Sequence, residues 1–225
     1  MIRAAFFDVD GTLTSEHTWK GLLDYFQVRG LRKTTLAVYM ATHYPLYFLR
    51  KMNLISEGNF RAPWTAHLAW FVRGYSPEQA NEVWAWAVDH YLVNYWREDT
   101  RKILSDHLQR GDLVMLVSSG PLPLVQYIAR ELGAQHAVGT RYEVRDGRFT
   151  GKTSPPVVID EQKARVARQY LQTHKIEIDM PGSSAYADSI ADLQLLEMVG
   201  NPVAVYPDDR LRAIAQQRGW RIHPD

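Results

Sequence analysis

Residues 4–14 of the chain read Ala-Ala-Phe-Phe-Asp-Val-Asp-Gly-Thr-Leu-Thr, an apolar run that ends in two acids and a glycine. The run from Ile2 to Phe7 is typical of a central parallel strand that is covered on both faces. Gly11 interrupts it, so the strand is expected to end at the two acids. Because ligands bind beyond the carboxyl ends of strands in open α/β sheets, Asp8 and Asp10 lie where chemistry is expected.

Asp8 and Asp10 are two positions apart and therefore lie on one side of an extended backbone. Two carboxylates this close repel each other and favour a cation, and ligands that are all oxygen favour Mg²⁺. The alternatives are a plain turn at a strand end and a calcium loop, which needs a closing glutamate and does not fit a preceding strand. We predict a catalytic role for this stretch.

Length and composition set the limits of the prediction. A chain of 225 residues can bury one large core, or a core with a small accessory domain. Its formal net charge of +1 gives no reason to expect nucleic acid as a partner. The sequence contains no cysteine, which excludes disulfides and cysteine metal sites. Because the chain begins with a core strand, we expect no signal peptide and a cytoplasmic protein. The expected oligomeric state is a monomer or a homodimer.

After Thr14 the pattern becomes helical and stays so to about His107, which indicates an insertion. Helices are expected over 18–28, over 31–51, from about residue 56 and from the capping box Ser76-Pro-Glu-Gln. Six of the seven tryptophans lie in this insertion, between residues 15 and 100. They are expected to fill the core of a small bundle, and an apolar substrate pocket is the alternative.

The apolar run from Leu36 to Leu49 is shorter than the about 20 residues that span a bilayer, so we predict no transmembrane segment. Basic residues flank the run on both sides: Arg32, Lys33, Arg50 and Lys51. Packing within the bundle is the favoured expectation, and peripheral contact with a membrane surface is the alternative.

The α/β pattern returns after Arg110. A strand over 113–117 is expected to end at Ser118, followed by a glycine turn and a helix to about residue 132. That serine could seat a phosphate or simply cap the helix. A hairpin is expected over 142–151, followed by a helix from about Asp160 with Lys163 in its first turn.

The last third of the chain repeats the pattern of a strand that ends in acids. A strand over 184–187 leads to Asp188, and Asp192 falls in the first turn of the next helix. A strand over 202–206 then precedes a final helix to about Arg218.

Asp8, Asp10, Ser118 and Asp188 thus follow three strands, with Lys163 at a helix start. This set suits phosphoryl transfer, because one carboxylate can accept the phosphoryl group while a second acts as acid and base. Mg²⁺, lysine and hydroxyl groups would neutralise the phosphoryl oxygens. The alternatives are a phospho-accepting receiver domain, which is shorter and lacks a helical insertion, and a non-catalytic phosphate-binding module.

In order and spacing, Asp8-Val-Asp-Gly-Thr-Leu-Thr, Ser118, Lys163 and Asp188-Ser-Ile-Ala-Asp192 resemble the four motifs of the haloacid dehalogenase (HAD) superfamily of phosphatases. The insertion looks like the helical cap of the phosphoserine-phosphatase-like branch, subfamily IB. The resemblance implies an α/β fold, a Rossmann-like doubly wound parallel sheet with an inserted helical-bundle cap. Residues 1–14 and 101–225 would form the catalytic core and residues 15–100 the cap.

The resemblance also implies a Mg²⁺-dependent phosphoric monoester hydrolase that works through an aspartyl-phosphate on Asp8, with Asp10 as acid and base. Asp8, the backbone carbonyl of Asp10 and Asp188 would bind the metal, and Asp192 would support the metal site. A phosphotransferase is the alternative activity.

The phosphate-binding residues that the resemblance implies are Thr12, which would shape the loop, with Ser118 and Lys163, which would hold the phosphoryl group. The small-molecule substrate is a phosphomonoester, either a phosphoserine-like metabolite or a bulkier, lipid-like phosphate. Two departures disfavour phosphoserine itself: Glu16 is one place out of register with the cap glutamate that recognises its amine, and Ala-Asp-Ser replaces Gly-Asp-Gly. Three basic residues are candidates to reach the pocket from the cap, although surface or packing roles are favoured for them: His17, Arg61 and Arg73.

Overall fold

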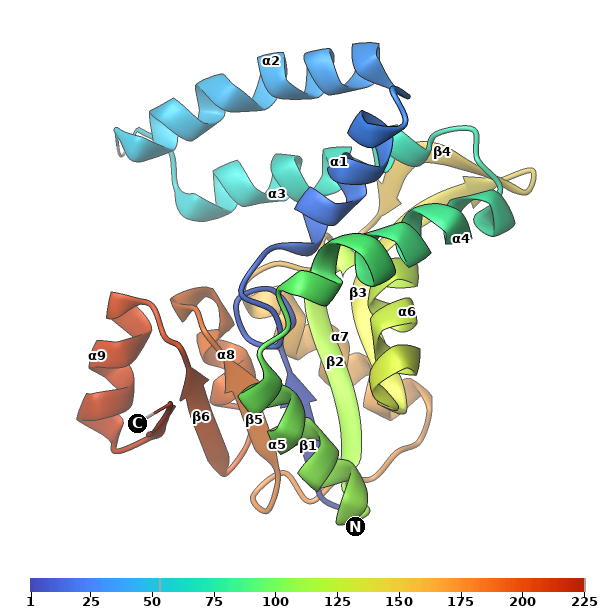
Figure 1. The fold of residues 1–225 in the computed structure, drawn as a ribbon. Coiled ribbons are helices and arrows are strands. Elements are labelled where there is room, and N and C mark those ends of the chain that lie inside the picture. The colour runs from blue at the N-terminus through green and yellow to red at the C-terminus, as the bar shows by residue number, and fades with distance from the viewer. Residues whose placement is uncertain (53, 225) are drawn as a thin grey trace.

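The computed structural model describes residues 1–52 and 54–224, with an α/β unit below and helices above it in Figure 1. Among these residues, seven strands form one sheet in the order β4-β3-β2-β1-β5-β6-β7. They are β1 (Ala4–Phe7), β2 (Leu113–Pro121), β3 (His136–Arg145), β4 (Arg148–Ser154), β5 (Ser184–Ala187), β6 (Asn201–Val205) and β7 (Arg221–His223). Strand β4 pairs antiparallel with β3, and the other neighbouring strands pair in parallel.

Strand β1 lies in the middle of the sheet and is buried on both faces. Ala5 and Phe7 belong to an apolar cluster that includes side chains of α5 (Glu98–Gln109) and α6 (Leu122–Leu132). Ala4 and Phe6 belong to a second cluster, with side chains of α7 (Glu161–Thr173), α8 (Leu193–Leu196) and α9 (Asp209–Arg218). Helices therefore cover both faces, and the predicted doubly wound α/β fold is confirmed.

The inserted segment is helical, as predicted. Its elements are α1 (Thr18–Val28), α2 (Lys33–Lys51), α3 (Glu57–His67), η1 (Leu68–Val72), α4 (Pro77–Trp86), η2 (Ala87–Tyr91) and η3 (Leu92–Asn94). The capping box at the start of α4 is present, because Gln79 N–H donates to Ser76 Oγ at 3.2 Å and Ser76 N–H donates to Gln79 Oε1 at 2.9 Å. In Figure 1, α2 and α3 form a layer above the carboxyl end of the sheet.

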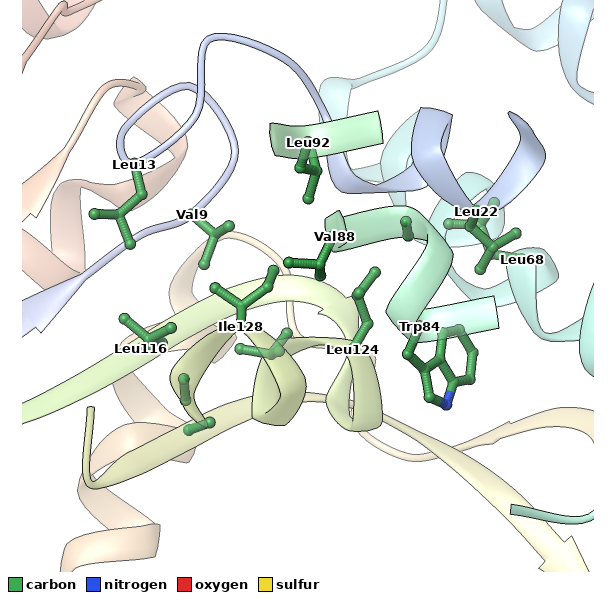
Figure 2. Close-up of a cluster of buried hydrophobic side chains, with 14 of the residues drawn as sticks. Val9, Leu13, Leu22, Leu68, Trp84, Val88, Leu92, Leu116, Leu124 and Ile128 are labelled. Atoms are coloured by element: carbon green, nitrogen blue, oxygen red, sulfur yellow. The ribbon is translucent and has the colours of Figure 1, made fainter. Parts of the chain in front are cut away.

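One apolar cluster joins the inserted helices to the sheet (Figure 2). Val88 of η2 points toward Leu124 and Ile128 of α6, and Val9, two residues after the end of β1, lies beside them. Burying these side chains together anchors this side of the insertion to the α/β unit. The division of the chain into a core and a cap at residues 14 and 100 stays a prediction.

The strand assignments differ most from the sequence prediction in β2, β3 and β7. Strand β2 runs on to Pro121, with an irregular register against β3 between Val117 and Pro121. Strand β3 begins at His136, before the predicted hairpin, and β7 was not predicted. These segments are strands because neighbours distant in sequence pair with them, which local patterns do not encode.

The predicted packing of residues 36–49 within the bundle holds for only part of that run. Tyr39 and His43 are buried, whereas Tyr44, Phe48 and Leu49 expose 54, 55 and 36% of their surface. Helix α2 passes through Pro45 without a break. Within residues 1–52 and 54–224, no helix has both the length and the apolar character that crossing a membrane requires.

Candidate active site

Two adjacent strands place their terminal acids side by side. Strands β1 and β5 are parallel neighbours, with Phe7 opposite Tyr186, and each is followed by an aspartate, Asp8 and Asp188. The backbone N–H of Asp8 donates to the carbonyl of Tyr186 at 2.9 Å, which continues the ladder for one more residue. The pairing of the strands therefore brings together two acids that lie 180 residues apart in sequence.

Three carboxylates and one ammonium group form the centre of the site. One carboxylate oxygen each from Asp8, Asp188 and Asp192 lie within 4.8 Å of one another. Lys163 Nζ, from the first turn of α7, lies 2.6 Å from Asp8 Oδ1 and 2.6 Å from Asp192 Oδ1. Asp8, Lys163 and Asp192 each expose only 2% of their surface.

The approach of the loop to Asp188 depends on Gly11. Its φ is +91°, and a Cβ atom added there would lie 2.1 Å from Asp188 Oδ2. Glycine alone combines this backbone conformation with the space that the carboxylate occupies. The next residue also contributes, because the buried hydroxyl of Thr12 lies 3.3 Å from Asp188 Oδ1 and 3.5 Å from Asp8 Oδ2.

The site concentrates negative charge in a buried place. Burial, followed by the charges of Asp8 and Asp192, raises the pKa of Asp188 to about 8. Burial also raises the pKa of Asp192, to about 6, although Lys163 opposes the shift. Burial alone would lower the pKa of Lys163, but Asp192 and Asp8 outweigh it and hold that pKa above its usual value. Lys163 is therefore charged and the acids compete for it, an arrangement that a divalent cation would stabilise.

Asp10 stands apart from the three clustered carboxylates. Its Oδ1 accepts the backbone N–H of Thr18 at 2.7 Å, and its Oδ2 accepts the Thr18 hydroxyl at 3.0 Å. Thr18 is the first residue of α1, so Asp10 satisfies an N–H group at the start of that helix, where a negative charge is favoured. Its carboxylate is thereby held in a fixed orientation at the cleft.

Two consecutive serines at the end of β2 have different surroundings. Ser118 is fully buried, and its Oγ accepts the backbone N–H of Gly120 at 3.0 Å. Ser119 lines the cleft, and its Oγ is buried without a hydrogen-bond partner among the described residues. From the sequence, Ser118 was predicted as the serine that binds phosphate, and Ser119 was not. The alternation of side chains along a strand was the available signal, since adjacent residues point to opposite sides.

A cleft of about 790 Å³ lies over these groups, and its lining combines the clustered acids with side chains of the inserted helices. The cleft lining includes Asp8, Asp10, Lys163, Asp188 and Asp192, together with His17, Trp19, Lys20, Met40, Tyr44, Tyr47, Arg50, Phe60, Arg61, Trp64, Thr65, Ser119 and Ser189. Of the three basic candidates predicted from the sequence, His17 and Arg61 line this cleft. Arg73 is exposed, and its backbone carbonyl accepts a hydrogen bond from Arg32.

Glu16 is engaged beside the cleft. Its Oε2 lies 2.5 Å from Lys20 Nζ, and the hydroxyl of Tyr91 donates to the same oxygen at 3.5 Å. Its negative charge is therefore already balanced by a neighbouring ammonium group.

Comparison with known proteins agrees with this geometry. Residues 5–197 match the family model of haloacid dehalogenase-like hydrolases. The chain is 32% identical to phosphoserine phosphatase SerB1 of Mycobacterium tuberculosis over 97% of its own length and 70% of that protein. It is 27% identical to a histidinol-phosphatase of Neisseria meningitidis, over 99% of this chain and 98% of that protein.

A solved structure supports the same assignment. A crystal structure of a protein of unknown function from Bordetella pertussis matches with a TM-score of 0.83 and 26% identity, covering 99% of this chain and 98% of that chain. The chain belongs to the haloacid dehalogenase-like hydrolases, in their phosphoserine-phosphatase-like branch, and is a phosphatase of that family.

Proposed function

We propose that the protein is a Mg²⁺-dependent phosphatase that hydrolyses a phosphomonoester through an aspartyl-phosphate on Asp8. The observation that carries this proposal is the arrangement of three carboxylates within 4.8 Å of one another, with the ammonium of Lys163 at 2.6 Å from Asp8. An acidic cluster that is buried beside a fixed cation and opens into a cleft is suited to phosphoryl transfer.

Mg²⁺ fits the donor set, because the clustered ligands are all oxygen atoms and carry more negative charge than one lysine neutralises. Asp8, Asp188 and the backbone carbonyl of Asp10 would hold the ion, and Asp192 would support it. When bound, Mg²⁺ would offset the charge of the phosphoryl oxygens. The ammonium of Lys163, 2.6 Å from Asp8 Oδ1, would contribute a second positive charge.

The chain's own residues supply both halves of the reaction. A carboxylate oxygen of Asp8 attacks phosphorus as the bond to the ester oxygen breaks, and Asp10 gives its proton to that leaving oxygen. Water then attacks the phosphoaspartate, Asp10 takes the proton, and the bond between phosphorus and Asp8 breaks. The hydrogen bonds from Thr18 would keep Asp10 oriented through both steps.

The two serines would have separate roles. The Ser119 hydroxyl lacks a partner within the described residues and faces the cleft, so it is placed to donate to a phosphoryl oxygen. Ser118 would hold the turn through its bond with Gly120, and its remaining proton could still reach the phosphoryl group.

The cleft favours a leaving group that is a ring or an apolar chain. Trp19 and Trp64 meet edge to face at 5.3 Å, and Tyr44 and Tyr47 line the same cleft. Glu16 is already paired, which leaves it poorly suited to bind the amine of phosphoserine. Among relatives, the histidinol-phosphatase name points to a substrate with a flat ring, which such a lining would stack against.

The test is phosphate release from p-nitrophenyl phosphate, phosphoserine, histidinol phosphate and lysophosphatidate, with Mg²⁺ and with a chelator. We expect Mg²⁺-dependent release, fastest from a ring or acyl ester. Asp8→Asn should form no phosphoenzyme and lose turnover. Asp10→Asn is the matched control: with p-nitrophenyl phosphate, whose leaving group needs no proton, it should form the phosphoenzyme and hydrolyse it slowly.

Other outcomes separate the alternatives. Transfer to an added alcohol in preference to water would identify a phosphotransferase. Absence of release from every ester, with phosphate still bound, would identify a phosphate-binding module. Preference for phosphoserine would refute the substrate class and leave the reaction intact.

A further inference from the structure

The C-terminal half of α2 and the residues after it carry large apolar side chains that are exposed. Beyond Tyr44, Phe48 and Leu49, the exposed set continues through Met52 and Leu54, which expose 67 and 63% of their surface. We call these five residues the apolar tip. Soluble proteins rarely gather exposed large apolar side chains in one place unless something binds there.

The apolar tip is contiguous. The rings of Tyr44 and Phe48 lie 6.4 Å apart on one side of α2, one helical turn from each other. At the end of the helix the N–H of Leu54 donates to the carbonyl of Leu49 at 2.9 Å, which places Leu54 beside the last turn. Figure 1 shows α2 as the outermost layer, separated from the sheet by α3, with its end projecting at the edge of the molecule.

Helix α2 has basic residues at both ends and contains neither Asp nor Glu. Arg32 and Lys33 stand at its start, and Arg50 and Lys51 at the end that carries the apolar tip. The whole chain has a formal net charge of only +1, so this segment is a local excess of positive charge. Of the two basic residues in the last turn of α2, Arg50 lines the cleft, and Lys51 is exposed beside the tip.

We infer that the apolar tip docks on an anionic membrane surface, with α2 lying in the plane of the interface. A projecting helix with exposed aromatic and aliphatic side chains, flanked by lysine and arginine, matches the lipid interface in both polarity and charge. The helix does not cross the bilayer, since no described helix is long and apolar enough. Tyr44 also lines the catalytic cleft, so docking would hold the mouth of the cleft close to lipid head groups.

The probe is co-sedimentation of the intact protein with vesicles of equimolar phosphatidylcholine and phosphatidylglycerol, and with phosphatidylcholine vesicles alone. We expect binding to the anionic vesicles that weakens as salt rises, and much weaker binding to the neutral ones. Phe48→Ser/Leu49→Ser should lower partitioning about tenfold or more, because two large apolar side chains leave the interface. Lys51→Glu should lower it about fivefold or more.

Val144→Ser is the matched control, because Val144 is 45% exposed on β3, away from the tip. It should bind vesicles like the native protein. Thermal unfolding and activity on p-nitrophenyl phosphate check that the serine variants fold, since Phe48 and Leu49 lie outside the cleft lining. Vesicle binding needs no catalysis, so its outcome is independent of the proposed reaction.

Three results would overturn the inference. The first is that the native protein does not co-sediment with the anionic vesicles. The second is Val144→Ser losing as much binding as the double variant. The third is a native dimer that Phe48→Ser/Leu49→Ser converts to a monomer without changing vesicle binding, which would assign the tip to a second copy of the chain. Should the double variant fail to fold, Lys51→Glu tests the same inference.

Discussion

Replacing Gly11 with alanine would test whether the loop after β1 and Asp188 must approach as closely as the structure shows. The substitution adds one methyl group and no charge, so its effect reports on space and backbone conformation alone. The substitution has two separate costs, backbone strain and a steric clash. Gly147 is a matched control, because only the backbone strain occurs there.

The first cost is backbone strain. Gly11 has φ +91°, a conformation that costs an L-residue roughly 1–2 kcal/mol. Gly147, in the turn between β3 and β4, has φ +70° and no atom within 4 Å of an added Cβ. Gly11→Ala and Gly147→Ala should therefore each lower the free energy of unfolding by about this amount. For a chain of this length the unfolding midpoint falls by about 2–4 °C for each kcal/mol.

The second cost, a steric clash, arises at Gly11 and not at Gly147. Its added Cβ would lie 2.1 Å from Asp188 Oδ2, so the carboxylate or the loop must move by about 1 Å or more to restore van der Waals contact. A displacement of about 1 Å in a catalytic site can reduce the rate by about 100-fold. In its proposed role as a metal ligand, a displaced Asp188 should lower Mg²⁺ affinity by at least the about 10–100-fold that follows when the groups orienting a metal ligand are lost.

The assay is phosphate release as a function of Mg²⁺ concentration, with thermal unfolding of both variants alongside. Gly11→Ala should show a lower kcat/KM and need more Mg²⁺, whereas Gly147→Ala should match the native protein in both. Equal Mg²⁺ dependence of the two variants would show that the close approach of Gly11 to Asp188 has no role in the site.

Two further predictions concern Ser119 and His107. Ser119→Ala should lower kcat/KM about 10- to 100-fold, because the loss of one hydrogen bond to a charged group costs about 1.5–3 kcal/mol. Ser118→Ala should lower the unfolding midpoint, because the bond to the Gly120 N–H is lost, whereas Ser119→Ala should leave the midpoint unchanged. A midpoint lowered by Ser119→Ala and not by Ser118→Ala would refute these roles. His107 hydrogen-bonds Asp112 and Tyr186 at 2.8 and 2.7 Å. Burial lowers the pKa of His107, although the hydrogen bond to Asp112 opposes the shift. The neutral His107 side chain therefore stabilises the fold fully above the pKa of histidine in the unfolded chain, about 6.5. This stabilisation is lost as pH falls through the lower pKa that His107 has in the folded protein. Between about pH 7 and pH 5, the unfolding midpoint of His107→Gln should therefore fall less than that of the native protein. An equal change of the two midpoints with pH would contradict this.

Local patterns were sufficient where a structure depends on neighbours in sequence. Helix α1 begins and ends at the predicted residues, and the capping box of α4 is formed as Ser76 and Gln79 indicated. Strand β5 also has its predicted bounds. Caps, helical periodicity and short apolar runs act over a few residues, so the sequence states them directly.

Most of the site could also be predicted from the sequence, because several of its residues come directly after predicted strands of the sheet. Asp8, Lys163, Asp188 and Asp192 were predicted as one group, and the structure brings them together. The chemical roles assigned to them remain predictions. Parallel strands have their carboxyl ends at the same edge of the sheet, and this rule alone predicts that residues following them lie close together.

The sequence by itself determined the fold class, the family motifs and the acids that meet at the sheet edge. Only the tertiary structure decided that Ser119 lines the cleft, that Glu16 pairs with Lys20, and that the end of α2 is exposed. It also decided that β7 forms, by pairing with β6. The physical reason is range: caps and periodicity are local, whereas the direction of a side chain and the covering of a helix face depend on which distant segments pack against them.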